Sequence, residues 1–437
     1  MPAWYFLRED KMGKSASGSN LQTSGRRVLI LCLCAAMIEG FDIQAAGVAA
    51  PKLGPALGLA PGQMALFFSS ATFGLIFGAI VGGRIADRFG RRAGLTLSLL
   101  IFGLFSLGTA LADTFPALVF MRFLTGVGLG GALPNLVAIA SEALSRERRG
   151  TAVGLMYAGI PIGGAVASAV SILGMHDSWE SIFVIGGILP IVLVPVLLLA
   201  LPDLKVARDH GDKPGIGATY RSIFGPSSWQ TTMLLWVGFF FSLLVLYLLL
   251  NWLPALMVAK GFSKYDAGIV QIVFNLGGAV GSLMVGRALD GMHRRRAVIL
   301  SYGLLVLALV GVAVLPNNLA LAIVSGVLLG ATIIGVQAIL YGLAPQSYAQ
   351  DVRGTAVGLA VAAGRLGSVA GPLLAGALVA GGKSATEVLL GIVPIAVVGG
   401  LASLLLVSRL ARAHNARNGD AAAIEHDNAA KLDAVGT

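Results

Sequence analysis

The chain of 437 residues is 56% hydrophobic and only 12% charged, and it contains 59 glycines. Soluble domains average about 25% charged residues and about 7% glycine, so this composition excludes an ordinary water-soluble fold and indicates a lipid environment. The two cysteines, Cys32 and Cys34, exclude a disulfide framework. A net charge of +10 would suit a nucleic-acid partner, but the positions of the basic residues argue against one.

Long apolar stretches bounded by charged residues recur along the whole chain. Each is close to the roughly 20 residues that a helix needs to cross about 30 Å of hydrocarbon. The sequence therefore predicts an all-α integral membrane protein with 12 transmembrane helices and both termini on one side. The predicted spans are 28–50, 64–86, 94–112, 115–141, 150–173, 180–201, 229–251, 266–288, 297–315, 318–343, 354–380 and 385–408.

The basic residues indicate the orientation of these spans. Arg122 and Arg365 fall inside spans, and nearly all other Lys and Arg residues lie in the tails and in loops of one parity. The loops of the other parity hold only Lys52, Lys260, Lys264 and Lys383. Because cytoplasmic loops carry the excess of positive charge, we expect both termini in the cytoplasm of a bacterium and the helices in its inner membrane.

Polar segments divide the chain into two six-helix halves. The first apolar stretch is too long for a signal peptide, so no cleavage is expected, and both Met1 and Met12 are candidate starts. We expect a disordered cytoplasmic tail at 1–24, an N-terminal half at 25–201, a cytoplasmic linker at 202–228, a C-terminal half at 229–410 and a second cytoplasmic tail at 411–437, disordered over 413–437.

An internal repeat supports this division. The string Arg-Gly-Thr-Ala-Val-Gly-Leu occurs at 149–155 and again at 353–359. The basic and acidic residues of 83–92 recur in 286–295. Both repeats lie at the cytoplasmic ends of equivalent spans, which predicts a parallel duplication with the halves related by an axis along the membrane normal.

Two motifs resemble those of the major facilitator superfamily. Residues 82–92, Gly-Gly-Arg-Ile-Ala-Asp-Arg-Phe-Gly-Arg-Arg, resemble its loop 2–3 motif, and Arg122 with the glycines that follow it resembles its fourth-helix motif. The resemblance covers about 25–410 and implies a transporter that works by alternating access. It also implies a cytoplasmic latch that stabilises the outward-open state, made of Asp87, Arg88, Arg91, Arg92, Asp290 and Arg294.

Further stretches resemble the aromatic acid/proton symporter family within that superfamily. Glu39-Gly40-Phe41-Asp42 is similar to its acid-Gly-x-acid motif, in which the first acid is usually Asp. Residues 44–50 and 156–163 resemble the 3-(3-hydroxyphenyl)propionate transporter branch, which the glutamate at 39 also fits. The resemblance implies proton-coupled import of an aromatic carboxylate, with proton-linked work on Asp42, Arg122 and Glu142.

Ionisable residues inside a membrane are costly and are functional candidates by default. Glu39 lies 12 residues after Arg27, about 18 Å along a helix that rises 1.5 Å per residue, which places it and Asp42 near the midplane. Two close buried carboxylates disfavour each other's charged form, so the pair is expected to bind and release a proton. The alternative is a structural pair that bonds to neighbouring helices.

The two buried arginines have two candidate roles. An arginine stays charged and holds a carboxylate with two parallel bonds, so each suits a counter-ion to Glu39 or Asp42 or an anchor for an anionic substrate. We expect Arg365 to be the substrate anchor, with a purely structural role as the alternative. Glu142, at the cytoplasmic end of its span, is either a proton-coupling residue or a solvated acid at a helix end.

Polar residues spaced four apart share a helix face and mark stripes that could contact substrate. Interhelical hydrogen bonding is an equally good interpretation of any single pair. The candidates for substrate contact are Asn135 and the pairs Tyr247 with Asn251, Gln271 with Asn275, and Gln337 with Tyr341.

Glycines four apart predict close helix packing: Gly74, Gly78 and Gly82 in one span, and Gly126 and Gly130 in another. Residues 159–164 resemble the fifth-helix motif of superfamily antiporters.

No enzyme chemistry, cofactor or metal site is expected. The five histidines lie in loops or tails without metal-ligand spacing, and no phosphate-binding loop is present, so the proton gradient is the expected energy source. We expect a monomer that contacts lipid, protons and a small aromatic acid. Drug efflux by antiport and a membrane sensor of aromatic acids that does not transport remain as alternatives.

Overall fold

A computed structural model describes residues 6–144, 149–173, 178–201, 216–226, 228–291, 294–314, 316–349 and 352–435. These residues form helices and short connections, and no strand occurs among them. The helices are α1 (Phe6–Leu57), α2 (Pro61–Phe89), α3 (Arg91–Ala110), α4 (Phe115–Ala143), α5 (Arg149–Ile172), α6 (Glu180–Ala200), α7 (Ile216–Phe224), α8 (Trp229–Ala259), α9 (Lys264–Gly291), α10 (Arg294–Val314), α11 (Leu319–Leu343), the single turn η2 (Ala344–Ser347), α12 (Arg353–Ala380) and α13 (Ala385–Val435).

Every helix except α7 and η2 contains a stretch long and apolar enough to cross a membrane, which gives the 12 predicted spans. The largest differences from the predicted spans are in the first, which runs Gly25–Leu57, and the seventh, which runs Trp229–Ala259. Prolines inside these helices, Pro51, Pro55 and Pro254, explain the difference. A proline removes one helical hydrogen bond, but neighbouring helices tolerate it in a membrane bundle, so it is a poor boundary signal here.

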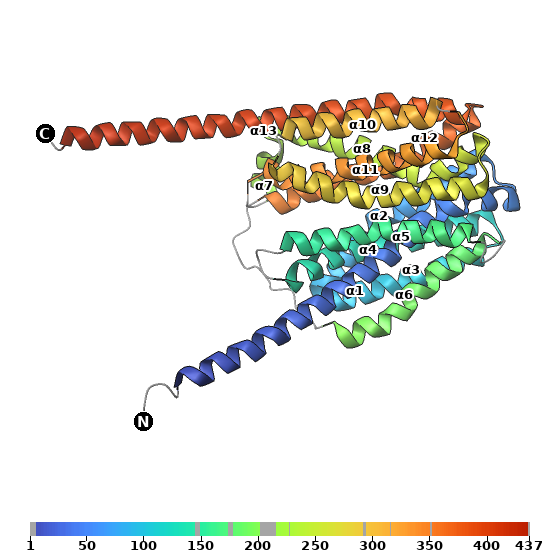
Figure 1. Cartoon of the computed structure of the whole chain (residues 1–437), viewed down its shortest axis with the longest axis horizontal. Helices are drawn as coiled ribbons and strands as arrows, with labels where there is room; N and C mark the ends of the chain where they lie inside the picture. Colours follow the sequence, from blue (N-terminus) through green and yellow to red (C-terminus); the bar gives the residue numbers. More distant parts are fainter. Residues whose placement is uncertain are drawn as a thin grey trace.

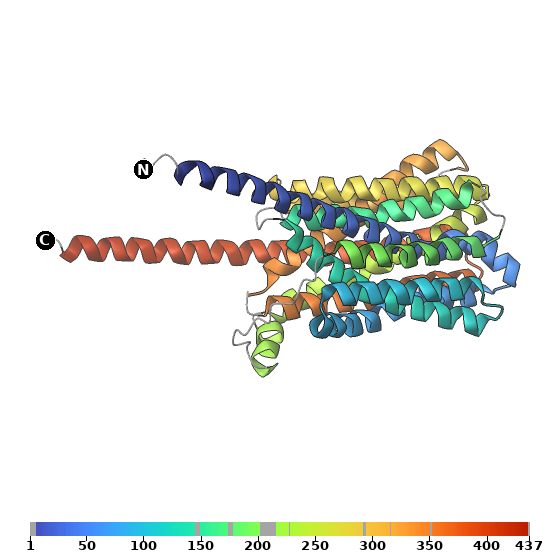
Figure 2. The same ribbon diagram turned by 90° about the horizontal axis from the view of Figure 1, so that it is seen from below.

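The helices form two groups that lie side by side (Figure 1). The helices α1–α6, blue to green, make one group, and α8–α13, yellow-green to red, make the other. Both termini lie beyond the same end of the bundle, which we call the terminal end, and α7 lies at this end too (Figure 2). The opposite end is called the far end. Part of the predicted linker, residues 202–215, lies outside the described residues.

The repeated sequence segments occupy equivalent places in the two groups. The identical strings begin α5 at Arg149 and α12 at Arg353, each the fifth spanning helix of its half. The charged repeat covers the connection from α2 to α3 and the one from α9 to α10. These positions agree with a fold of two related six-helix halves.

Both predicted tails differ from the disorder expected for them. Helix α1 begins at Phe6 and α13 extends to Val435, and both project beyond the bundle (Figure 1). Residues 421–435 contain six alanines and no glycine or proline. Alanine has the highest helix propensity, so such a segment continues a helix that the bundle has already nucleated.

The predicted glycine contacts hold α2 against α4. A Cβ atom at Gly78 would overlap the carbonyl oxygen of Val127, and one at Gly130 would overlap that of Leu75. The two backbones are therefore in direct contact, as small residues allow in membrane helices. This packing fixes α4, and with it Arg122, close to the first two helices.

Candidate functional site

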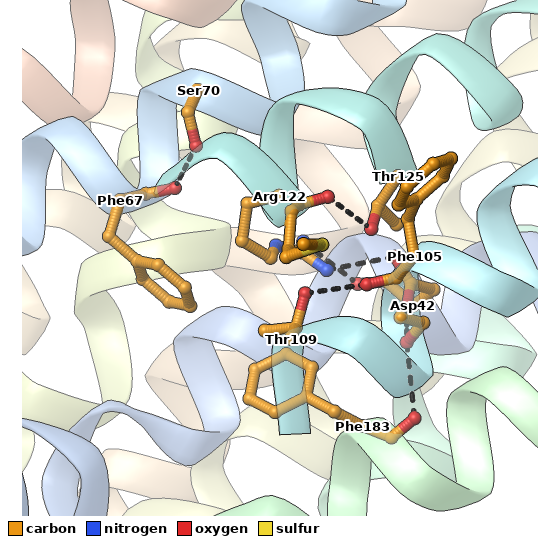
Figure 3. Close-up of polar contacts among 10 residues, drawn as sticks. Asp42, Phe67, Ser70, Phe105, Thr109, Arg122, Thr125 and Phe183 are labelled. Atoms are coloured by element: carbon orange, nitrogen blue, oxygen red, sulfur yellow. Dashed lines mark hydrogen bonds and ion pairs between the residues drawn. The ribbon is translucent and has the colours of Figure 1, made fainter. Parts of the chain in front are cut away.

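Asp42 on α1 and Arg122 on α4 form an ion pair inside the N-terminal half (Figure 3). The Asp42 side chain is fully buried and Arg122 is 1% exposed. Nη1 of Arg122 lies 3.1 Å from Oδ2 of Asp42, and the hydroxyl of Ser106 donates to Oδ1 at 2.8 Å. Each carboxylate oxygen thus has a partner, which is the condition for keeping a charged pair away from water.

Two aromatic rings enclose the Arg122 guanidinium. Its central carbon lies 5.8 Å from the ring centre of Phe67 on α2 and 5.4 Å from that of Phe183 on α6. Figure 3 shows both rings beside the arginine. Rings at this distance attract a cation through their π faces and exclude water. Nε of Arg122 has no hydrogen-bond partner among the described residues.

Glu39, one turn before Asp42 on α1, has different surroundings. It is 1% exposed, and its Oε2 has no hydrogen-bond partner in the described part of the chain. The cation that acts on it is Arg365 of α12, in the other half. The two acids thus interact with different cations: Asp42 bonds to Arg122 of its own half, and Glu39 is acted on by Arg365 of the other half.

Arg365 is half-buried, and it lies close enough to Glu39 of the other half to interact with its charge. Its Nη1 donates to the hydroxyl of Tyr247 on α8 at 2.8 Å. The ring of Tyr341 on α11 lies 5.1 Å from that of Phe239 and 6.3 Å from that of Tyr157 on α5. Tyr247 and Tyr341 both lie close enough to Arg365 to interact with its charge. A cation beside two tyrosines suits an aromatic anion, since the rings can stack while the arginine binds the charge.

Gln337 lies one turn before Tyr341 on α11. It is 7% exposed, and neither its amide oxygen nor its amide nitrogen has a partner in the described structure. Buried amides are almost always hydrogen-bonded, so an unpartnered one a helical turn from Tyr341 is a candidate ligand contact. Of the predicted pair, Tyr341 lies close enough to Arg365 to interact with its charge.

A small cavity lies between the two ionic groups. Arg122 and Thr72 border it from the N-terminal half, and Tyr247 and Asn251 border it from the C-terminal half. Its volume of about 10 Å³ is close to the minimum for one water molecule. Since Tyr247 also binds Arg365, the cavity is bordered by one residue of each ionic group, Arg122 and Tyr247.

Sequence comparison identifies the family. A model of the Major Facilitator Superfamily matches residues 32–372 and 235–426. The chain belongs to the major facilitator superfamily. It is 43% identical to the 3-(3-hydroxy-phenyl)propionate transporter of Escherichia coli, over 87% of this chain and 94% of that protein. It is 31% identical to a 4-hydroxybenzoate transporter of Pseudomonas aeruginosa, over 87% of this chain and 92% of that protein.

Solved structures agree on the fold. A bacterial homologue of the human lysosomal transporter Spinster, inward-facing and unoccupied, has a TM-score of 0.70 at 17% identity and covers 89% of this chain and 98% of its own. The Escherichia coli xylose transporter XylE, partially occluded and inward-open, has a TM-score of 0.69 at 16% identity. The match covers 86% of this chain and 98% of the XylE chain. The curated relatives are transporters, and this superfamily member is a transporter and no enzyme.

An amide network joins the halves of this transporter nearer the far end. Gln44 on α1 donates from Nε2 to Oδ1 of Asn275 on α9. Its Oε1 accepts from Nε2 of Gln271 and from Nδ2 of Asn275, each at 2.8 Å. The predicted pair Gln271 and Asn275 thus makes interhelical hydrogen bonds, as the alternative interpretation holds. Oε1 of Gln271 alone lacks a partner in the described residues.

Two predicted site residues lie elsewhere. Asn135 donates to the carbonyl of Gly131 on its own helix at 2.9 Å and packs near Gly94 of α3, inside the N-terminal half. Glu142 pairs with Arg91 at 2.6 Å, with both side chains partly exposed at the terminal end. Neither residue joins the buried groups.

The predicted latch is only partly described. The side chains of Asp87 and Asp290 lie outside the described residues, and Arg294 is exposed. Arg88 lies over the ring of Phe89, and Arg92 donates to two carbonyls near the end of α6, at Leu198 and Leu201. In the described contacts, Arg88, Arg91 and Arg92 all bind within the N-terminal half.

Sequence reasoning missed several site residues. Gln44 and Tyr157 lie in the two stretches that resemble the hydroxyphenylpropionate branch. The sequence therefore pointed to these stretches, but it did not indicate what either residue does. Nothing in the sequence marked Ser106, Phe67 and Phe183 as site residues, because serine and phenylalanine are common in membrane helices. Only the packing of α2, α3 and α6 around Arg122 distinguishes them.

Proposed function

We propose that this transporter imports an aromatic carboxylate, hydroxyphenylpropionate- or hydroxybenzoate-like, together with protons across the bacterial cytoplasmic membrane. The observation that carries the proposal is the half-buried Arg365 at the contact of the halves, bonded to Tyr247 and close enough to Glu39 to act on its charge. A fixed cation, tyrosine rings and the unpartnered amide of Gln337 match the carboxylate, ring and hydroxyl of such a substrate.

The names of the relatives support this substrate class. The relatives at 43%, 31% and 30% identity are named for 3-(3-hydroxyphenyl)propionate, 4-hydroxybenzoate and gallate, the last from Pseudomonas putida. All three substrates carry a carboxylate and at least one ring hydroxyl. The shared chemistry is what the Arg365 group would recognise.

Competition for Arg365 supplies the coupling. Without substrate, Arg365 offsets part of the cost that burial imposes on a charged Glu39. When a substrate carboxylate binds the arginine, two anions share one cation in a poorly hydrated site, which favours protonation of Glu39. Substrate and proton are then carried together. The Asp42–Arg122 pair is a second candidate proton site, and its arginine borders the cavity beside Tyr247.

The proposed orientation puts the terminal end in the cytoplasm, in line with its basic loops. The amide network of Gln44, Gln271 and Asn275 then lies between the central groups and the outside. It is an outer gate, and its hydrogen bonds must break when the halves rock to the outward-open state. Alternating access follows from this change.

Antiport is the weaker candidate. The glycines of 159–164 that resemble an antiporter motif pack α5 on α1: a Cβ at Gly163 would overlap the carbonyl of Met37, and one at Gly164 would overlap the amide of Gln44. This packing accounts for these glycines without an antiport role.

Uptake into proteoliposomes tests the proposal. With a pH gradient, acid outside, the wild-type protein should accumulate 3-hydroxyphenylpropionate. Arg365→Gln should lower uptake by at least about 100-fold, since breaking a buried charged pair costs about 3–5 kcal/mol. Arg353→Gln, an exposed arginine at the start of the same helix, is the matched control and should retain uptake.

Three outcomes contradict the proposal. Wild-type vesicles that accumulate none of a panel of aromatic acids, yet bind them, indicate a sensor. Loss from preloaded vesicles driven by the gradient indicates efflux. Full activity of Arg365→Gln removes the arginine from the site.

A further inference from the structure

Two tyrosine rings from opposite halves meet near Arg365. They belong to Tyr157 of α5 and Tyr341 of α11, and their ring centres lie 6.3 Å apart at an angle of 37°. We propose that these two tyrosines determine the specificity of the transporter, because their hydroxyls bind the ring hydroxyl of the substrate while Arg365 binds its carboxylate. This inference rests on the proposed function for its substrate class and assigns the selectivity of the same site.

The hydroxyls of both tyrosines are available to a ligand. Neither makes a hydrogen bond among the described residues, and both side chains are partly exposed. Tyr247 differs, since it is buried and its hydroxyl already accepts from Arg365. A phenol hydroxyl donates one hydrogen bond and accepts others, so two unengaged phenols suit a ligand group that also does both. A ring hydroxyl is such a group, whereas a carboxylate only accepts.

The internal repeat shows the depth of Tyr157 relative to Arg365. The identical strings begin α5 at Arg149 and α12 at Arg353, and the two helices occupy equivalent places in their halves. Tyr157 lies eight residues after the first of these positions, and Arg365 lies twelve after the second. Four residues of helix correspond to about 6 Å, so Tyr157 lies nearer the terminal end. Tyr341 agrees with this depth, since it lies two residues before α11 ends on that side.

The contacts of Arg365 separate the two ends of a bound substrate. Tyr247 bonds to Arg365 directly, at 2.8 Å. Tyr157 and Tyr341 make no hydrogen bond to it in the described structure, although both lie close enough to interact with its charge. A carboxylate on Arg365 therefore meets Tyr247 first. The ring and its hydroxyl, at the opposite end of a single-ring acid, then meet the pair on the terminal side.

Packing holds each tyrosine in its own half. Helix α5 lies directly against α1 here, because a Cβ at Gly40 would overlap the carbonyl of Ile160, three residues after Tyr157. The ring of Tyr341 packs on that of Phe239 of α8, 5.1 Å away at 74°. Side chains that packing has already ordered discriminate between ligands more sharply than mobile ones. The two hydroxyls thus reach the site from two separately ordered groups of helices.

Gln337 is the competing candidate for the ring hydroxyl, since it lies one turn before Tyr341. Both polar atoms of its amide are enclosed in this conformation, whereas the two tyrosine side chains are partly exposed. A ligand beside Arg365 therefore reaches the phenols before the amide. Substitution of each residue distinguishes the two assignments.

Uptake of two acids that differ by one hydroxyl tests the proposal. Proteoliposomes with the wild-type protein should show a higher kcat/KM for 3-hydroxyphenylpropionate than for 3-phenylpropionate. Tyr157→Phe and Tyr341→Phe keep the rings, and each should lower this preference about fivefold, the effect of one lost hydrogen bond. The change should come from a higher KM for the hydroxylated acid. Uptake of 3-phenylpropionate should stay unchanged, which shows that the variants fold and work.

Tyr302→Phe is the matched control. The hydroxyl of Tyr302 bonds with Ser403 between α10 and α13, inside the C-terminal half, so its loss should leave the preference unchanged.

Three results would overturn the assignment and leave the proposed function standing. One is wild-type uptake of both acids with equal kcat/KM. Another is an equal loss of uptake for both acids in the two tyrosine variants, which places the hydroxyls at the carboxylate or in the fold. The third is a preference that survives both tyrosine variants and disappears in Gln337→Leu. Wild-type protein that takes up neither these acids nor other aromatic acids refutes the proposed function itself.

Discussion

Two buried carboxylates one turn apart on α1 differ because each faces a different arginine. Asp42 is bound by Arg122 and Ser106, and aromatic rings enclose the arginine. Glu39 has an unpartnered oxygen and a more distant cation at the contact of the halves. Asp42 is therefore held in one arrangement, and Glu39 is placed where substrate can change its surroundings.

The first prediction at this scale concerns Asp42. Asp42→Asn removes the titratable group at nearly constant size, so accumulation should fall to the level that the single proton of Glu39 supports, while exchange of substrate across the membrane continues. Ser106→Ala is the control: it removes one hydrogen bond, worth about 1 kcal/mol, and leaves the carboxylate and its arginine in place. Accumulation and counterflow in proteoliposomes measure both effects. Undiminished accumulation by Asp42→Asn would remove this residue from coupling.

Glu142 shows how a charged residue at a helix end differs from one at the midplane. Its bond to Arg91 is short, but the side chains are 37% and 22% exposed. Such pairs contribute about 0–1 kcal/mol. The pair also joins α3 to α4 within one half, so its breakage alone does not release one half from the other.

At the scale of the helices, the length of the apolar stretches was sufficient to predict the spans. The energetic cost of burying a charge in the membrane was sufficient to predict the charged residues of the site. A charge in hydrocarbon is rare, so Glu39, Asp42, Arg122 and Arg365 were visible as candidates from sequence. Their pairing was not, because two acids and two arginines can combine in several ways until the helix packing is known. The part that Gln44 plays with Gln271 and Asn275 was also beyond prediction, since these residues come from helices far apart in the sequence.

The second prediction belongs to the contact of α2 with α4. Gly130→Val places a branched side chain against the backbone of Leu75, where even a Cβ has no room, so the helices must separate. Overpacking of this kind costs about 1–3 kcal/mol or more. Gly303→Val on α10 is the control, because a Cβ there meets no atom within 4 Å. Thermal unfolding in detergent should show a lower Tm for the first variant only; equal Tm values would contradict the close contact.

At the scale of the whole molecule, the halves share their ionic chemistry unequally. The N-terminal half holds both midplane acids and Arg122, and the C-terminal half holds Arg365. Each acid thus has its own arginine, one within its half and one across the contact. Movement of the halves changes the distance between Glu39 and Arg365 directly. It leaves the Asp42–Arg122 pair within one group of helices. This arrangement gives each acid its own cationic partner, so each is a candidate carrier of one proton.

The last prediction follows from this charge count. An aromatic acid is a monoanion at pH 7, because an unperturbed carboxyl titrates near pH 4. Carried with one proton it moves no net charge, whereas with two protons the cycle moves one positive charge inward and gains about 2.3 kcal/mol per 100 mV. That energy corresponds to nearly 50-fold more accumulation.

We expect Glu39 and Asp42 each to contribute a proton, so wild-type uptake should respond to a potassium/valinomycin potential set separately from the pH gradient. Glu39→Gln should leave residual uptake that ignores the potential, and Glu39→Asp, which keeps the carboxylate, should retain the response. Wild-type uptake that does not respond to the potential would mean that a single proton moves and that Glu39 only tunes the site around Arg365.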